Sequence, residues 1–163
     1  SPAGTEQLGC LLAGLCKADT VISLSGDLGA GKTALTRGLA RGLGCKGQVA
    51  SPTFILLMEH PAGDDGLALY HFDVYRLLDV GGSQSFAELG LDEYFTAGGV
   101  SVIEWGEGIS DLLPPDTLDI RLYRQDSKDE QKREIKICWP GHGGELSQLG
   151  RQVRREQEAK GKC

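Results

Sequence analysis

The segment Gly26–Thr33, with the sequence Gly-Asp-Leu-Gly-Ala-Gly-Lys-Thr, constrains the fold of this 163-residue chain more than any other feature. It has the spacing G-x-x-x-x-G-K-[ST]. The apolar residues 21–24 before it predict a buried strand, and leucines at four-residue spacing after it, ending at Gly44, predict a helix. A strand, a glycine-rich loop and a helix in this order predict a loop that binds phosphate.

The residue types in this loop suit that chemistry. Glycines adopt positive φ, so that successive N–H groups curl around phosphate oxygens, and the N-terminus of the following helix adds a positive dipole. Lys32 is then placed to reach the β- and γ-phosphates of a nucleotide, and Thr33 offers a hydroxyl to Mg²⁺. The expected nucleotide contacts are Gly26, Asp27, Leu28, Gly29, Ala30, Gly31, Lys32 and Thr33.

A loop of this kind needs a carboxylate at the end of a neighbouring strand, to organise Mg²⁺ or the attacking water. Asp73 and Glu104 both qualify, because each follows a run of apolar residues. The alternative for either is a surface acid at a strand end. Thr53, in Ser-Pro-Thr, offers a second hydroxyl like the switch threonines that sense a γ-phosphate, although such a tripeptide is more often a simple turn.

The rest of the chain predicts an α/β protein of the P-loop class, a three-layer sandwich with a mixed β-sheet. We expect a nucleotide-binding domain over residues 1–143 and a C-terminal helix with a frayed basic tail over 144–163. The expected elements are a helix over 5–17 with Thr5 as N-cap, a hairpin of strands 54–59 and 67–75, short helices within 83–95, and strands over 100–105, 118–123 and 134–139.

Composition narrows the function classes. The net charge of −6 and the pI of about 5.1 argue against a dedicated nucleic-acid binder, so any contact with RNA is expected to be indirect. The five cysteines show no C-x-x-C spacing, which favours reduced thiols over a disulfide framework or a zinc site. No apolar run approaches the roughly 20 residues of a membrane span. We therefore expect a cytoplasmic protein with no membrane partner.

Four motifs in order give the chain a resemblance to a known family: residues 26–33, Ser51-Pro-Thr-Phe54, His71-Phe-Asp-Val-Tyr-Arg76 and Val102-Ile-Glu-Trp105. Over residues 5–139 it resembles the bacterial tRNA threonylcarbamoyladenosine biosynthesis ATPases, the TsaE family. The resemblance implies a small ATPase using ATP and Mg²⁺. It also implies two partners, a sugar-kinase-like threonylcarbamoyl transferase protein and its paralogue, in the modification of adenosine 37 of tRNA.

The resemblance also implies roles for single residues. Lys32 becomes the phosphate lysine, Thr33 and Glu104 the magnesium ligands, Asp73 the residue needed for hydrolysis, and Thr53 the switch threonine. For two further residues, two alternative roles are expected. Thr5 lies near the expected nucleotide base or caps the first helix, and Trp105 lies near the nucleotide or the partner surface, or is a half-buried aromatic at a strand end.

Two other functions share this loop. A small-molecule kinase needs an acceptor pocket and an arginine-bearing lid, and the sequence offers no convincing lid, because Arg121 and Arg124 lie on or beside a predicted strand. A GTP-dependent switch needs an Asn-Lys-x-Asp motif, which does not occur in the chain. An ATP hydrolase, weak alone and dependent on partners, is therefore the favoured interpretation.

Overall fold

A six-stranded mixed sheet forms the centre of the computed structural model, which describes residues 1–50, 55–124 and 132–160, with side chains up to residue 155. The strands lie in the order β2-β3-β4-β1-β5-β6. Their bounds are β1 Val21–Ser25, β2 Leu57–His60, β3 Leu69–Asp73, β4 Val100–Glu104, β5 Leu118–Arg124 and β6 Arg133–Cys138. The four central strands are parallel, and β2 and β6 pair antiparallel at the two edges. The predicted α/β fold with a mixed sheet is confirmed.

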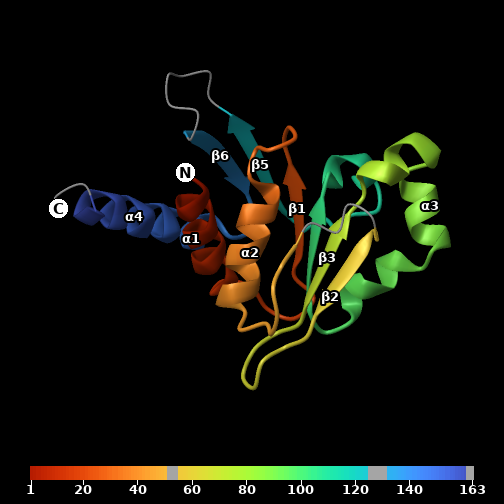
Figure 1. Ribbon diagram of the computed structural model, residues 1–163, viewed down its shortest axis with the longest axis horizontal. Helices are drawn as coiled ribbons and strands as arrows, with labels where there is room; N and C mark the ends of the chain where they lie inside the picture. Colours follow the sequence, from red (N-terminus) through yellow and green to blue (C-terminus); the bar gives the residue numbers. More distant parts are fainter. Residues whose placement is uncertain (51–54, 125–131, 161–163) are drawn as a thin grey trace.

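Helices cover both faces of this sheet. The helices are α1 Pro2–Ala13, α2 Lys32–Gly42, α3 Ser83–Glu88 and α4 Gly143–Lys160, with three short 3-10 helices, η1 Tyr75–Val80, η2 Leu91–Thr96 and η3 Gly106–Ile109. Figure 1 shows α1, α2 and α4 on one side of the molecule and α3 at the opposite end. The layers therefore match the expected three-layer sandwich.

Alternation along each strand sends apolar side chains into two separate cores. Ile22 and Leu24 of β1 pack with α1, α2 and α4, whereas Val21 faces the other way, into the core around Phe72 and Phe86. The first core holds α2 rigidly against β1 and β4. Because the glycine-rich loop lies between β1 and α2, this packing fixes both of its ends.

The predicted elements differ from the structure in three places, the first of which is that α1 ends at Ala13 and not at residue 17. Thr5 is not the N-cap of α1, because the helix begins at Pro2 and the Ser1 side chain accepts the Gly4 N–H. Proline at the first helical position, with serine before it, favours that earlier start. The strand expected over 67–75 ends at Asp73, where η1 begins two residues later. The hairpin β2–β3, the short helices after residue 83 and the β5–β6 pair are confirmed.

Among the described residues, no helix is long and apolar enough to cross a membrane. The four cysteines in that part of the chain, Cys10, Cys16, Cys45 and Cys138, are unpaired, in agreement with the expected free thiols.

Candidate functional site

The loop between β1 and α2 depends on three glycines with positive φ. Gly26, Gly29 and Gly31 have φ of 133°, 75° and 115°, a conformation that strains any residue with a side chain. Gly26 is also closely packed, since a Cβ atom there would lie 2.2 Å from the Leu122 carbonyl oxygen on β5. The glycines therefore let the loop turn back over the end of the sheet.

Helix α2 begins directly after this loop without a side-chain cap. Gly31 is its N-cap residue and contributes no side-chain hydrogen bond. The first N–H groups of a helix have no partner within the helix, and their dipoles favour an anion. The end of α2 is thus suited to bind phosphate oxygens.

Lys32 is folded back into this loop. Its side chain is buried, and Nζ donates hydrogen bonds to the carbonyl oxygens of Gly26 and Asp27, the second at 3.0 Å. The same Nζ lies 3.7 Å from the centre of the Trp105 ring. Burial lowers the pKa of the Lys32 ammonium group, and nearby carboxylates, Glu104 first among them, oppose this shift. Two hydrogen bonds and the contact with the Trp105 ring thus hold the ammonium group at the centre of the loop.

Glu104 connects the loop to the sheet. Thr33 Oγ1 donates to Glu104 Oε1 at 3.0 Å, and His71 Nε2 lies 2.9 Å from the same oxygen. His71 and Glu104 lie on the adjacent strands β3 and β4, on the face that packs against α2, and both are buried. The carboxylate is therefore oriented from two sides.

Asp73 lies beside Glu104 at the same edge of the sheet. The two residues are register partners on β3 and β4, and Asp73 Oδ1 accepts the Tyr75 N–H at 3.2 Å. Two carboxylates and one hydroxyl are hard oxygen ligands of the kind that Mg²⁺ prefers. In the described part of the chain no group of three or more His, Cys, Asp or Glu side chains could hold a metal alone. An ion held by these few oxygen atoms would need further ligands, such as water or phosphate.

These groups open onto one cavity of about 500 Å³. Trp105 forms one side of it and follows β4 with a φ of 65°, which turns its ring over Lys32. The exposed Tyr75 ring lies 5.1 Å from the Trp105 ring. The lining residues are Leu28, Gly29, Gly31, Lys32, Thr33, Ala34, Asp73, Tyr75, Glu104 and Trp105.

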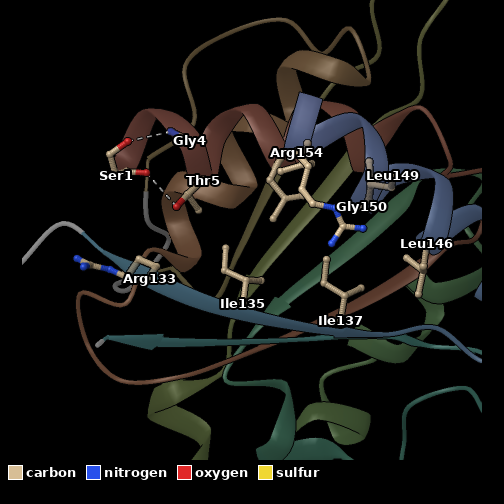
Figure 2. A pocket seen from close by; sticks show the side chains of 12 residues that line it. Ser1, Gly4, Thr5, Arg133, Ile135, Ile137, Leu146, Leu149, Gly150 and Arg154 are labelled. Carbon is tan, nitrogen blue, oxygen red and sulfur yellow. Dashed lines mark hydrogen bonds between the residues drawn. The ribbon is translucent and has the colours of Figure 1, made fainter. Parts of the chain in front are cut away.

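A second cavity, of about 470 Å³, lies on the other side of the loop, between α1, β6 and α4 (Figure 2). Thr5 is one of its lining residues, and its side chain lies 3.6 Å from the position that a Cβ of Gly31 would occupy. Arg133, on β6, donates from Nε to the Ala30 carbonyl oxygen at 3.1 Å. Both residues link this cavity to the phosphate loop.

Most, but not all, of the residues predicted from the sequence thus lie around the same cavity. Lys32, Thr33, Asp73, Glu104 and Trp105 surround the first cavity, whereas Thr5 reaches the loop from the second. Thr53 lies outside the described residues.

Sequence reasoning missed two contacts at the site. His71 lies in one of the four motifs, but the motif does not identify Glu104 as the partner of its side chain. Sequence reasoning also did not anticipate Arg133 at the loop, because an arginine opening an edge strand carries no local signal of that contact.

Comparison with known proteins finds one family and several relatives that are similar to this chain. The family model "Threonylcarbamoyl adenosine biosynthesis protein TsaE" matches residues 1–135. A protein of Streptomyces coelicolor named tRNA threonylcarbamoyladenosine biosynthesis protein TsaE is 47% identical over 127 residues, which cover 77% of this chain and 84% of that protein. The Bacillus subtilis protein of the same name is 40% identical over 146 residues, 90% of this chain and 86% of the relative.

A solved structure is similar over nearly the whole fold. The crystal structure of YdiB from Bacillus subtilis superposes with a TM-score of 0.71 and 36% sequence identity, covering 96% of this chain and 91% of that one.

Proposed function

We infer that this chain, which belongs to the TsaE family, binds Mg²⁺ and ATP at the loop after β1 and hydrolyses the ATP during the threonylcarbamoyl modification of tRNA. One observation carries the inference. Lys32, Thr33, Asp73 and Glu104 converge on one cavity, although they come from three separate parts of the sequence. A cation, a hydroxyl and two carboxylates beside an uncapped helix are the groups that a triphosphate with its metal requires.

Lys32 would bind the β- and γ-phosphates. In the protein alone its ammonium group donates to two carbonyl oxygens of its own loop, so phosphate oxygens would replace these acceptors without the side chain leaving the site. A phosphate also favours the protonated lysine, and so offsets the burial that lowers its pKa. The N–H groups of the first turn of α2, which no side chain caps, would bind further phosphate oxygens.

Thr33 and Glu104 would hold Mg²⁺. Bound there, the ion would neutralise charge on the phosphates and orient them for attack. The hydrogen bond from Thr33 to Glu104 keeps both ligand oxygens on the same side of the cavity, and His71 keeps the carboxylate from rotating away. Asp73, one strand further along the same edge, would orient the attacking water.

The partners belong to the same proposal. The chain would act with a sugar-kinase-like threonylcarbamoyl transferase protein and its paralogue, and would contact tRNA only through them. Residues 1–144 carry a net charge of −8, which disfavours direct binding of a polyanion. The apolar side chains of Leu28 and Tyr75, 85% and 51% exposed, lie at the mouth of the cavity, where a partner surface could exclude water.

Product analysis with a panel of nucleotides tests this proposal. We expect inorganic phosphate from ATP, slowly with the chain alone and faster with the two partner proteins. A phosphorylated acceptor would instead indicate a small-molecule kinase, and a preference for GTP would indicate a regulatory switch. Filter binding of tRNA should show weak retention by the chain alone. Tight binding, or full turnover that no partner changes, would contradict the proposed role.

A further inference from the structure

The cavity between α1, β6 and α4 lies outside the cluster of phosphate and metal groups. Six of its twelve lining residues are aliphatic: Leu8 on α1, Ile135 and Ile137 on β6, and Leu146, Leu149 and Val153 on α4. Figure 2 shows the two isoleucines rising from the strand toward α4, and the Arg154 guanidinium reaching from α4 toward that strand. The cavity is thus a partly apolar slot between a strand and a helix, and two arginines, Arg133 and Arg154, are among its lining residues.

Edge strand β6 is less well covered than its neighbour. On β5, the side chains of Ile120 and Leu122 that face the same helical layer are fully buried. On β6, Ile135 and Ile137 face that layer but remain half-buried. A volume of about 470 Å³ is within the range of small-molecule sites, and apolar side chains gain stability when such a space is filled. Helix α4 therefore stands away from β6 by enough to admit a flat ligand.

The slot lies next to the phosphate loop. Thr5 belongs to its lining, and its side chain lies 3.6 Å from the position that a Cβ of Gly31, the N-cap residue of α2, would occupy. Arg133 belongs to the lining as well, and holds the Ala30 carbonyl. A ligand whose phosphates lie on the loop would place the group attached to them next to Thr5 and Arg133, at this end of the slot. A nucleoside is such a group, since a flat ring with two apolar faces is joined through a ribose to the phosphates.

We propose that α4 is the outer wall of the nucleoside site, and that it clamps the base of the bound nucleotide against β6, with Arg154 as a positioning residue at the base. This inference rests on the proposed function, because it takes ATP as the ligand of the loop. It assigns a role to a helix that follows the residues matched by the family model, 1–135. Arginine suits the position, since its planar guanidinium stacks on ring faces and donates to ring nitrogens.

Two glycines of α4 provide a matched test. A Cβ at Gly150, which lines the slot, would meet only the Arg154 guanidinium, at 3.8 Å, and Gly144 has nothing within 4 Å and is not part of the lining. Leucine improves helix propensity at both positions. Gly150→Leu should fill the slot without harming the fold, and Gly144→Leu is the control. Each protein is titrated calorimetrically with ATP and with inorganic tripolyphosphate, which lacks the nucleoside.

We expect Gly150→Leu to weaken ATP binding at least tenfold and to leave tripolyphosphate binding unchanged, whereas Gly144→Leu should alter neither. Arg154→Gln should weaken ATP binding severalfold, with Arg151→Gln, which is not among the residues that line the slot, as its control. Thermal unfolding without ligand shows whether each variant is folded. If Gly150→Leu is unstable, the comparison of Arg154→Gln with Arg151→Gln tests the proposal.

Wild-type ATP affinity in both Gly150→Leu and Arg154→Gln would overturn the role of α4 while leaving the proposed function intact. Equal losses for ATP and tripolyphosphate would also overturn it, because the slot would then act on phosphates. If the unmodified protein binds neither ligand, the proposed function itself fails, and the inference fails with it.

Discussion

Replacing His71 with asparagine should weaken the Mg²⁺ dependence of nucleotide binding while leaving metal-free binding nearly unchanged. His71 Nε2 lies 2.9 Å from Glu104 Oε1, and the two side chains are 0% and 4% exposed, so solvent does not screen the contact. Asparagine is too short to reach that oxygen, and among the described residues Thr33 would remain as the side chain that donates a hydrogen bond to the carboxylate. Removal of a residue that hydrogen-bonds to a metal ligand typically lowers the affinity for the metal by about 10- to 100-fold, or about 1.4–2.7 kcal/mol.

The assay is a series of ATP titrations at increasing Mg²⁺ concentration, with His60→Asn as the matched control. His60 is a second buried histidine. Its ring centre lies 6.1 Å from that of His71. His60→Asn should keep the wild-type Mg²⁺ dependence. Our account of Glu104 would be refuted if His71→Asn needed no more Mg²⁺ than the wild type, or if both variants shifted equally.

Three further outcomes are expected. Asp73→Asn should keep ATP affinity within about threefold and slow hydrolysis by about 100-fold in single-turnover assays, because its carboxylate is assigned to the water and not to the metal. Gly26→Ala should lower the free energy of unfolding by about 2–4 kcal/mol in urea titrations, since its φ of 133° and the Leu122 carbonyl oxygen leave no room for a methyl group. Alkylation at pH 8, followed by mass spectrometry, should modify the exposed Cys138 well before Cys16, because burial raises the pKa of the Cys16 thiol to about 12 and keeps it protonated until far more alkaline pH.

The sequence predicted the parts of the site that depend on local spacing. Gly26, Gly31, Lys32 and Thr33 lie within eight residues, and their pattern specifies both the turn of the loop and the start of α2. The order of strands and helices likewise follows from apolar periodicity and turn residues, and the fold agrees with it.

Contacts between distant strands could not be predicted in the same way. The hydrogen bond between His71 and Glu104 exists because β3 and β4 pair in parallel with a particular register, and no short-range pattern encodes that register. Thr5 shows a related limit. A threonine ahead of an apolar run suggests a cap. In the structure, however, Ser1 is the N-cap and the helix begins at Pro2, so Thr5 lies inside the helix and faces the loop.

The central claim is that this loop binds the phosphates of ATP through Lys32 with the help of Mg²⁺. Calorimetric titration of ATP into the wild type and into Lys32→Ala, each with and without Mg²⁺, tests it most directly. We predict Mg²⁺-enhanced binding to the wild type, and affinity at least tenfold weaker in Lys32→Ala, because the variant lacks the buried cation at the centre of the loop. Equal ATP affinity in the two proteins would contradict the claim.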